Sequence, residues 1–549
     1  MKLNGAQIVV EQLLAHGATT VFGYPGGAVL PLYDELYKNS GKIHHILTAH
    51  EQGAAHAADG YARASGKAGI VIATSGPGAT NVVTGIANAY LDSVPLVAIT
   101  ANVAIPLLGK DSFQEVDIVG ITQSIVKHSF VVRNVDTLEH TMNEAFSIAT
   151  SGRQGPVLVD IPKSVQTDEC EYIGKPSAQE SKPTCSFDVE RVAAAIKDCK
   201  RPYIYAGGGV IASGAGNELR ELSERLSAPV GLSMMGLAAL PNDYALNLGM
   251  SGMHGRYAAT VAKSECDVLI ALGVRFSDRA TGNVGKYKEG KLIIHVDIDH
   301  AEIGKNVLPS MYVCGDVKEV LAKLLPMLPA MRNDEWTARI GELKQTEASY
   351  ESGDFTPRNI IETVGRFCDE DTVVATDVGQ HQMWVMQYYN FKKPRTLLTS
   401  GGLGAMGYGL GAAIGGCVAQ NARKTVLFTG DGSFGMNLTE LATAVSEKLP
   451  IVVVILNNGT LGLPFQWQNL FFEKRYSHTK LDRKTDFAAL AKAFGAEGHS
   501  VANLPQLETI LCQLPDKIPT VIDCRIDMNE IVLPMIPAGG SVKDIIVRG

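Results

Sequence analysis

Two stretches near the end of the chain decide its fold: TVLFTGDGSF at residues 425–434 and IVVVILNN at residues 451–458. Each begins as a short apolar run rich in β-branched residues, typical of a strand buried on both faces. The interval between the runs has room for one helix, so we expect two parallel strands joined by a helical crossover. The pair predicts an α/β domain that carries polar groups at the carboxyl ends of its strands.

The same alternation of apolar runs and amphipathic stretches continues towards the N-terminus. Further strands are expected at residues 43–47, 69–73, 95–100, 156–161, 202–205, 268–272, 291–296, 372–375 and 520–526, with helices at 8–14, 52–64 and 79–90. Polar, proline-containing stretches at 167–183 and 326–357 favour linkers. The sequence therefore predicts an α/β protein of three open parallel-sheet domains, at residues 1–170, 186–330 and 356–549.

Composition excludes several classes of protein. With 46% hydrophobic and 19% charged residues in 549, the chain can bury large cores and is unlike a disordered protein. The net charge of −8 and the lack of a basic block argue against nucleic acid. No apolar run approaches the ~18 residues of a membrane span, and the first residues are too polar for a signal peptide. The nine cysteines are spread singly, as expected of free thiols in the cytoplasm.

The polar residues after the two deciding strands suit a metal and a diphosphate. Asp431 and Asn458 would follow neighbouring strand ends, and hard oxygen ligands of this kind suit Mg²⁺. Gly430 and Gly432 would let a diphosphate approach the backbone at the start of the next helix. Either piece alone is more simply explained as an ordinary turn, so the prediction rests on the pair.

The spacing of GDG and NN resembles the thiamine diphosphate-binding motif. The resemblance implies a pyrophosphate-binding third domain, in which Asp431, Asn458 and the Thr460 carbonyl hold Mg²⁺. The cofactor then needs a carboxylate for its aminopyrimidine ring, and Glu51 in TAHEQGAAH matches the family's glutamate in a pyrimidine-binding first domain. A helix N-terminal acid is the plainer interpretation of Glu51 by itself. In this family the glutamate of one chain serves the diphosphate site of another, which implies at least a homodimer, or a homotetramer.

Further motifs narrow the resemblance to the acetohydroxyacid synthase family, also called acetolactate synthases. They occur in order over the whole chain: VFGYPGGAVLPLYD (21–34), ATSGPGATN (73–81), GKDSFQEVDIVGIT (109–122), GRQGPVLVDIPK (152–163), GMHG (252–255), GVRFSDRATGN (273–283), HVDID (295–299), TDVGQHQMW (376–384), SGGLGAMGYG (400–409) and VLPMIPAGG (532–540). The resemblance implies decarboxylation of pyruvate and transfer of the two-carbon unit to a second 2-oxo acid. The product would be 2-acetolactate or 2-aceto-2-hydroxybutyrate, in branched-chain amino-acid biosynthesis.

The resemblance also assigns roles to single residues. Arg279 matches the arginine that receives the carboxylate of the second 2-oxo acid, and Trp467 matches the indole that favours 2-oxobutyrate over pyruvate. Met406 matches the residue that bends the cofactor. Catalytic or substrate-cleft positions are matched by Gly26, Glu51, Phe113, Gln114 and Lys163.

Cofactor contacts are implied in two sets. The residues implied to contact thiamine diphosphate are Gly379, Gln380, His381, Gly404, Met406, Gly430, Asp431, Gly432, Ser433 and Asn458. The resemblance also implies a central FAD-binding domain. The residues implied to contact FAD are Arg153, Gly207, Gly208, Gly209, Met253, His254, Gly255, Arg275, Asp297, Ile298, Asp316 and Val317. By itself the glycine triplet is poor support for a nucleotide site.

The chain departs from the family's pattern near the expected substrate cleft. Leu463, Pro464 and Phe465 replace the usual M-V-R/K, Ala104 and Ile105 replace a proline and a polar residue, and Gly411 replaces a proline. Altered substrate preference and neutral drift explain these changes equally well. The alternatives are an altered carboligase or decarboxylase, a flavin-linked pyruvate oxidase, and a non-enzymatic homologue. A small regulatory subunit is a further expected partner.

Overall fold

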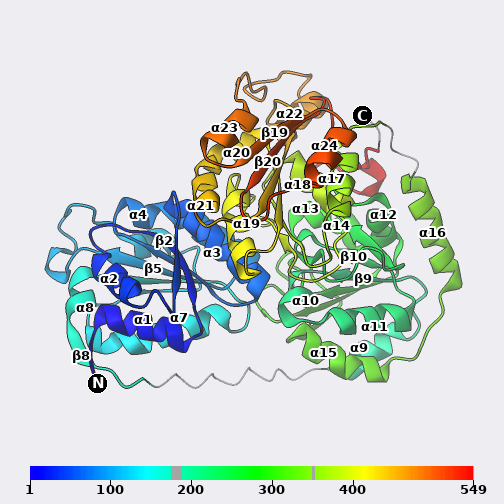
Figure 1. Ribbon diagram of the computed structural model, residues 1–549. Helices are drawn as coiled ribbons and strands as arrows, with labels where there is room; N and C mark the ends of the chain where they lie inside the picture. Colours follow the sequence, from blue (N-terminus) through cyan, green and yellow to red (C-terminus); the bar gives the residue numbers. More distant parts are fainter. Residues whose placement is uncertain (175–187, 349–352, 548–549) are drawn as a thin grey trace.

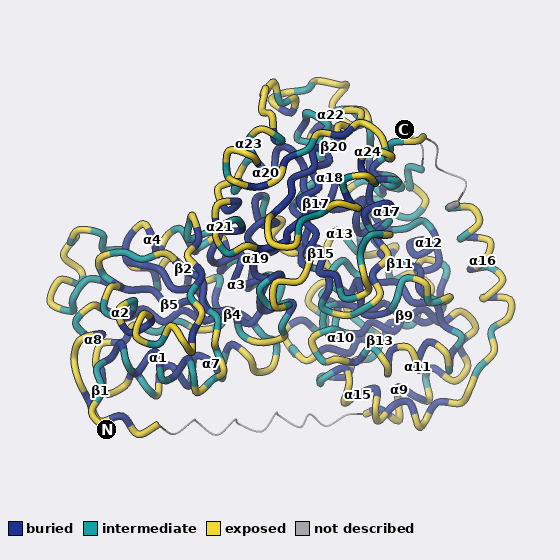
Figure 2. Tube along the Cα trace, in the orientation of Figure 1, coloured by how far each residue is buried: buried dark blue, intermediate teal, exposed yellow. Residues whose placement is uncertain are grey.

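The computed structural model describes residues 1–174, 188–348 and 353–547. It contains three parallel six-stranded sheets, one after another along the chain (Figure 1). Each expected strand is present, with ends shifted by at most two residues. In Figure 2 most residues of the central strands are coloured as buried, and the exposed residues lie mainly at the periphery. The predicted α/β class with three parallel-sheet domains is confirmed, whereas the exact domain boundaries stay a prediction.

The first sheet has the strand order β3-β2-β4-β5-β7-β6. Its strands are β2 (Thr20–Tyr24), β3 (His44–Leu47), β4 (Gly69–Ala73), β5 (Leu96–Asn102), β6 (His128–Val131) and β7 (Pro156–Pro162). The helices are α1 (Gly5–Ala15), α2 (Leu30–Lys38), α3 (Glu51–Ser65), α4 (Pro77–Asn81), α5 (Val83–Asp92), α6 (Ile118–Thr122), α7 (Leu138–Thr150) and α8 (Lys163–Thr167). Apolar residues of α1, α2 and α7 cover one face, and those of α3 and α5 cover the other. Strands covered on both faces explain the continuous apolar runs.

The second sheet has the order β11-β10-β9-β12-β13-β14. Its strands are β9 (Pro202–Ala206), β10 (Val230–Leu232), β11 (Asn247–Met250), β12 (Val268–Leu272), β13 (Leu292–Asp297) and β14 (Met311–Cys314). The helices are α9 (Val189–Ile196), α10 (Gly208–Ser213), α11 (Gly216–Leu226), α12 (Tyr257–Glu265), α13 (Asp278–Thr281), α14 (Val284–Lys288), α15 (Val317–Leu324) and α16 (Asp334–Ala348).

The third sheet has the order β16-β15-β17-β18-β20-β19, with the two deciding strands side by side at its centre. Its strands are β15 (Val373–Thr376), β16 (Leu397–Leu398), β17 (Thr425–Gly430), β18 (Ile451–Asn457), β19 (Glu497–Val501) and β20 (Thr520–Arg525). The helices are α17 (Pro357–Arg366), α18 (Gln380–Tyr388), α19 (Tyr408–Ala419), α20 (Asp431–Asn437), α21 (Leu441–Ser446), α22 (Gly462–Phe471), α23 (Phe487–Ala493) and α24 (Leu504–Leu511).

Helices α3 and α19 join the first and third domains by close backbone contact. A Cβ atom on Gly411 would lie 2.8 Å from the Cβ of His56 and 2.9 Å from the Gly53 carbonyl oxygen. One on Gly60 would lie 2.7 Å from the Cα of Ala412. Glycine at position 411, which sequence alone left unexplained, is thus required by the helix crossing.

The structure corrects three expectations. The helix expected at 79–90 is two helices, α4 and α5, separated at Val82. The linker expected at 326–357 contains α16, whose side chains Trp336, Ile340 and Leu343 are buried in the middle domain. In the linker expected at 167–183, β8 (Glu169–Glu171) pairs antiparallel with β1 (Lys2–Asn4). Residues 175–183 lie outside the described residues.

Two remaining expectations concern membranes and cysteines. In the described part of the chain, no helix is both long and apolar enough to cross a bilayer. The eight cysteines in those ranges are free thiols, while Cys185 lies outside them.

Candidate active site

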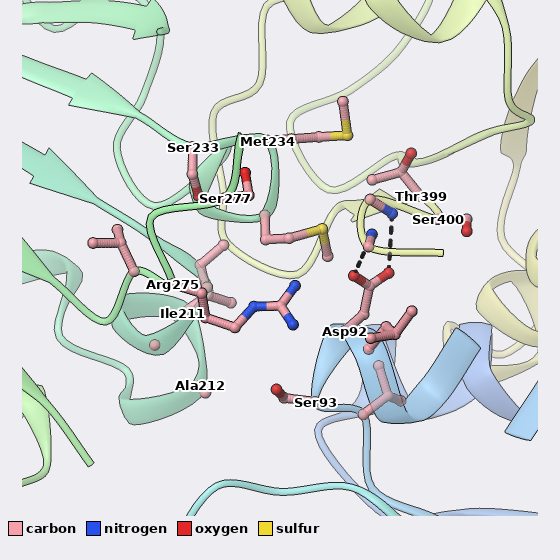
Figure 3. Close-up of a pocket in the computed structure, with 18 of the residues that line it drawn as sticks. Asp92, Ser93, Ile211, Ala212, Ser233, Met234, Arg275, Ser277, Thr399 and Ser400 are labelled. Carbon is pink, nitrogen blue, oxygen red and sulfur yellow. Dashed lines mark hydrogen bonds between the residues drawn. The ribbon is translucent and has the colours of Figure 1, made fainter. Parts of the chain in front are cut away.

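A cavity of about 2460 Å³ lies where the three domains meet. Figure 3 shows part of its wall, with Arg275 and Ser277 from the middle domain facing Asp92 and Ser93 from the first. Of the residues expected to contact FAD, the lining includes Arg153, Gly208, Gly209, Met253, His254, Gly255, Arg275, Asp297, Ile298, Asp316 and Val317. Arg279, Gly404 and Trp467 line the same cavity. The expected flavin set is therefore brought together within one chain, except for Gly207.

Charged side chains fix the wall between the first and middle domains. The Arg153 guanidinium pairs with Glu302 at 2.7 Å and with Asp299 at 3.3 Å, and its Nε donates to the Ser93 hydroxyl. Burial raises the pKa of Asp297 to about 6. Arg153 thus bridges the first and middle domains in the wall of the cavity.

The glycine triplet is needed partly for chain packing. Gly207 N–H donates to the Leu272 carbonyl, and a Cβ on Gly209 would lie 2.7 Å from the Cα of Gly273. The start of α10 therefore lies directly against the turn after β12, and only Gly208 and Gly209 reach the cavity.

His254 adds an unsatisfied polar group to this wall. Its side chain is buried, burial lowers its pKa to about 4, and no described residue hydrogen-bonds its Nδ1. Buried polar atoms in proteins normally have a partner, so this nitrogen fits contact with a bound polar molecule.

Arg279 and Trp467 face each other in the cavity from different domains. The guanidinium carbon of Arg279 lies 5.9 Å from the centre of the Trp467 ring, and the guanidinium also contacts the Met253 sulfur. The Arg279 side chain is 61% exposed, so its charge is available to a ligand. A cation beside an apolar ring suits a small molecule with a carboxylate and a short apolar chain.

The divergent segment on α22, residues 463–465, lies partly in the cavity wall and partly in the protein core. Leu463 and Pro464 line the cavity. Phe465 does not: it is buried and stacks on Tyr476 with ring centres 4.3 Å apart. Of the three divergent residues expected near the substrate cleft, Phe465 therefore does not contribute to the cavity wall. Pro464 lies in the first turn of α22, where a missing N–H breaks no helical hydrogen bond.

The deciding strands bring the expected metal ligands to one sheet edge. Gly430 is opposite Leu456 in the parallel pairing, so Asp431 and Asn458 follow adjacent strand ends. Burial raises the pKa of Asp431 to about 6. The Asn458 amide donates to Gln380 at 2.9 Å, while its oxygen accepts from Thr460. Asn458 is thus held by two side chains that were themselves expected at this site.

A second unsatisfied ring lies at the same edge. His381 is buried, its pKa is lowered to about 3 by burial, and its Nε2 has no hydrogen-bond partner among the described residues. A Cβ on Gly430 would lie 2.9 Å from its Nδ1. Ser433 donates to the Val378 carbonyl at 2.7 Å. The glycine, the carboxylate and the free ring nitrogen fit a diphosphate held through a divalent cation.

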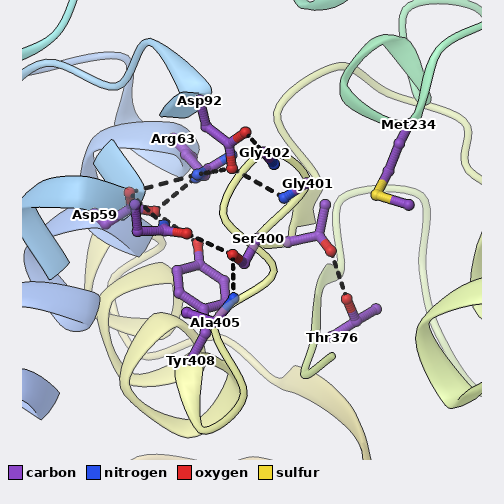
Figure 4. Close-up of polar contacts among 12 residues, drawn as sticks. Asp59, Arg63, Asp92, Met234, Thr376, Ser400, Gly401, Gly402, Ala405 and Tyr408 are labelled. Carbon is purple, nitrogen blue, oxygen red and sulfur yellow. Dashed lines mark hydrogen bonds and ion pairs between the residues drawn. The ribbon is translucent and has the colours of Figure 1, made fainter. Parts of the chain in front are cut away.

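Met406 lies on a loop that the first domain holds in place. Asp92 accepts from the N–H groups of Gly401 and Gly402, at 3.0 and 2.7 Å (Figure 4). Arg63 donates to both Asp92 and Asp59, and Asp59 also accepts from the Tyr408 hydroxyl at 2.6 Å. Sequence reasoning missed Asp92, because an aspartate at the end of an ordinary helix carries no local signal.

Glu51 belongs to a separate group in the first domain. Its carboxylate accepts from the Asn81 amide at 2.9 Å, and a Cβ on Gly78 would lie 3.2 Å from it. Thr74, beside Gly26, has an unpartnered buried hydroxyl among the described residues. The Phe113 ring is 88% exposed.

The cavity lining separates this group from Arg279 and Trp467. None of Gly26, Glu51, Phe113, Gln114 and Lys163 lines the large cavity of the described chain. The expected site residues are thus divided between the cavity, the diphosphate edge and the region around Glu51, and Lys163, Phe113 and Met406 lie outside the cavity lining.

Comparison with known proteins places these features in a family context. Three models of thiamine pyrophosphate enzymes match the chain: the N-terminal TPP binding domain at residues 3–121, the central domain at 189–324 and the C-terminal TPP binding domain at 377–524. The chain is 44% identical to the acetolactate synthase isozyme 2 large subunit of Escherichia coli, over 100% of both chains. It is 43% identical to the probable acetolactate synthase large subunit of Methanocaldococcus jannaschii, over 99% of this chain and 95% of that protein. The large subunit of Lactococcus lactis is 43% identical, over 98% and 95%.

Proposed function

We infer the function from one premise: this chain belongs to the thiamine pyrophosphate enzymes, in the family of acetolactate synthase large subunits. It forms 2-acetolactate from pyruvate with thiamine diphosphate. Transfer to 2-oxobutyrate, giving 2-aceto-2-hydroxybutyrate in branched-chain amino-acid biosynthesis, is the second proposed reaction. The observation that carries the choice of substrate is the Arg279 guanidinium facing the Trp467 indole across one cavity.

Arg279 binds the acceptor by its carboxylate in this proposal. A guanidinium can form two parallel hydrogen bonds with a carboxylate, which fixes the acid's orientation as well as its charge. Trp467 then contacts the acceptor's alkyl group, where one extra methylene is worth about 1–3 kcal/mol. Leu463 and Pro464 complete that wall.

The diphosphate edge would hold thiamine diphosphate through Mg²⁺. Asp431, Asn458 and the Thr460 carbonyl are the proposed metal ligands, and His381 Nε2 and the backbone at Gly430 would contact the diphosphate. Support comes from the unpartnered ring nitrogen of His381 and from the buried carboxylate of Asp431, which follows β17 next to the end of β18. When bound, the thiazolium ring accepts the electron pair released as pyruvate loses carbon dioxide.

Glu51 is the proposed proton donor to the aminopyrimidine ring. Its Oε2 accepts a hydrogen bond from Asn81, which orients the carboxyl group. Helix α3 begins at Glu51 and is packed against α19 by backbone contact, so the group is held rigidly. Met406 is the proposed support of the bent cofactor, on the loop that Asp92 holds.

The large cavity is proposed to hold FAD. Its volume, the Arg153 cation and the unpartnered His254 nitrogen suit a dinucleotide that spans the first and middle domains. The resemblance assigns the flavin a structural role.

A homodimer is the smallest proposed assembly. Glu51 and the exposed Phe113 do not line the cavity of their own chain, and a second copy would supply them. A homotetramer of the same pairs is also compatible with this arrangement. Because the relatives are described as large subunits, we also propose a separate small partner subunit. The proposed domains are residues 1–170, 186–330 and 356–549.

Acetolactate release from pyruvate, with and without thiamine diphosphate, tests the function. We expect product only with the cofactor, and equal release in both samples would overturn the proposal. A flavin-linked oxidase would instead bleach bound FAD with pyruvate at the turnover rate, whereas the synthase would not.

A further inference from the structure

A second cavity, of about 320 Å³, lies directly behind Arg279. Its walls are α12, the segment from residue 278 to 291, and residues 536–543 near the C-terminus. Met253 and Arg279 line both this cavity and the large one. The two cavities are therefore separated by the turn that carries the proposed acceptor arginine.

Positive charge dominates the lining of this second cavity. Four lysines line it: Lys263, Lys286, Lys291 and Lys543. Within residues 1–174, 188–348 and 353–547, none of them has a carboxylate within ion-pair distance. The acids in the lining are Asp278, which lies beside Arg279, and the exposed Glu289. Asp544 accepts hydrogen bonds from Ser541, and these bonds together with the charges of Lys286 and Lys543 lower its pKa. These two lysines are therefore partly balanced by Asp544, whereas Lys263 and Lys291 are not.

Lys263 is the deepest of the four. It is 4% exposed, and its Nζ lies 4.9 Å from the centre of the Tyr205 ring and 5.2 Å from that of Tyr287. The Nζ donates to the Ser251 hydroxyl at 3.1 Å and to the Ala280 carbonyl at 3.0 Å. Burial lowers the pKa of Lys263 to about 7, and a bound anion would favour its charged form.

Tyr287 provides an independent sign of a ligand. It is 8% exposed, lines the cavity, and its hydroxyl has no hydrogen-bond partner among the described residues. Lys291 Nζ lies 5.6 Å from the same ring, so two cations stand over its face. A buried hydroxyl without a partner, close to lysines that have no carboxylate within ion-pair distance among the described residues, is a donor set that fits an oxyanion.

We propose that this cavity binds a small dianion, such as a phosphate ester or a dicarboxylate, through Lys263, Lys286, Lys543 and the Tyr287 hydroxyl. The volume exceeds that of a single phosphate ion and suits a small metabolite. Lysines act as point charges, which match a phosphate or a flexible diacid without demanding a planar partner.

The bound anion would also stabilise the turn that carries Arg279. Lys263 donates to the carbonyl of Ala280, and the Arg279 carbonyl accepts from Met253 N–H at 2.8 Å. An anion favours the charged form of Lys263 and so strengthens its bond to Ala280. This consequence rests on the proposed function, whereas binding itself does not.

Calorimetric titration of the cofactor-loaded protein tests the site. Inorganic phosphate and succinate are the two probes, with sodium chloride at equal ionic strength as the reference. We expect saturable binding of at least one probe, and the preferred probe distinguishes a phosphate from a dicarboxylate ligand. Saturable binding of neither would overturn the proposal.

Matched variants locate the binding. The double variant Lys286→Met/Lys543→Met removes two exposed cations and is expected to weaken binding about tenfold. Lys263→Met is expected to abolish it, because a buried contact is lost. Lys288→Met on α14, outside the lining, is the control and keeps wild-type affinity. Unchanged affinity in the double variant, or equal weakening in the control, would contradict the assignment.

The KM for the acceptor gives a second readout. The probe that binds should lower it in the wild type and leave it unchanged in the double variant. Bound probe without a change in KM would remove the link to Arg279 but leave the binding site in place.

Discussion

The large cavity and the Glu51 group are assembled in different ways. The residues expected around FAD come from two domains of one chain and, except for Gly207, line one cavity, and Arg153 bridges the two domains. Glu51 and Phe113 do not line that cavity, although the same proposal places them in the reaction. A site completed within one chain should bind its ligand at any protein concentration. A site that takes residues from two chains should lose activity when the chains separate.

The largest effect is expected for Glu51→Gln. The amide cannot supply the proton, so kcat should fall by about 10²–10⁴. FAD content should be unchanged, because Glu51 does not line the cavity. The measurement is acetolactate release together with the flavin absorbance of the purified protein, and Glu11→Gln on α1 is the control.

Mixing two inactive variants tests whether the active site is shared between two chains. Glu51→Gln and Asp431→Asn should each be inactive, but their mixed dimers contain one intact site if the site is shared. After reassociation we expect about a quarter of wild-type activity. A mixture that stays inactive would show that each chain uses its own Glu51.

A smaller effect is expected within the cavity, for Arg279→Lys. Lysine keeps the charge but loses the second hydrogen bond to a carboxylate, so the KM for the acceptor should rise about 10- to 100-fold. Arg475→Lys, at another exposed arginine of the same cavity, should leave it unchanged. An unaltered KM in Arg279→Lys would remove the acceptor role from this residue.

Gly411→Ala tests the contact that holds α3 and Glu51. The added methyl group would meet His56 and the Gly53 carbonyl, so the free energy of unfolding should fall by about 1–3 kcal/mol. Gly341→Ala is the matched control, because that helical glycine is exposed and has no atom near its Cβ position. It should stabilise the protein by about 0.5–1 kcal/mol. Both values come from urea unfolding, and equal changes would contradict the packing argument.

The last expected effect, similar in size to that of Gly411→Ala, concerns pH at the same crossing. Burial lowers the pKa of His56 to about 4, below the value of 6.5 for an exposed histidine. The unfolded chain therefore binds more protons than the folded chain between these pH values. The contribution of His56 to the free energy of unfolding is fully present above pH 6.5 and is lost as the pH falls towards 4. By pH 5 the loss should be about 2 kcal/mol. His56→Gln should flatten this part of the stability profile, and an unchanged slope would assign it to other groups.

Strands and strand-end motifs were predictable because their signals are local. A strand covered on both faces must be apolar, and Asp431 and Asn458 follow such strands directly. The α3–α19 crossing was not predictable, since the need for glycine at 411 comes from a helix far away in sequence. Asp92 was missed for the same reason: its partners Gly401 and Gly402 belong to another domain.

Helix α16 had a signal that was overlooked. Trp336, Ile340 and Leu343 recur at helical spacing within a stretch whose prolines and charges suggested a linker. Because these side chains are buried, the helical spacing of apolar residues was the better predictor in this stretch than its content of prolines and charges. The placement of Glu51 away from the large cavity could not be anticipated from one chain's sequence without the family resemblance.

The first turn of α22 separates positions that can be engineered from positions that cannot. Leu463 and Pro464 present their side chains to the cavity, while the neighbouring Phe465 is buried against Tyr476. A mutant library aimed at new acceptors can therefore vary residue 464 widely and residue 463 among apolar side chains, because Leu463 also packs against the core. The library should keep residue 465 aromatic, because the buried ring holds α22, which carries the varied positions, against the rest of the domain.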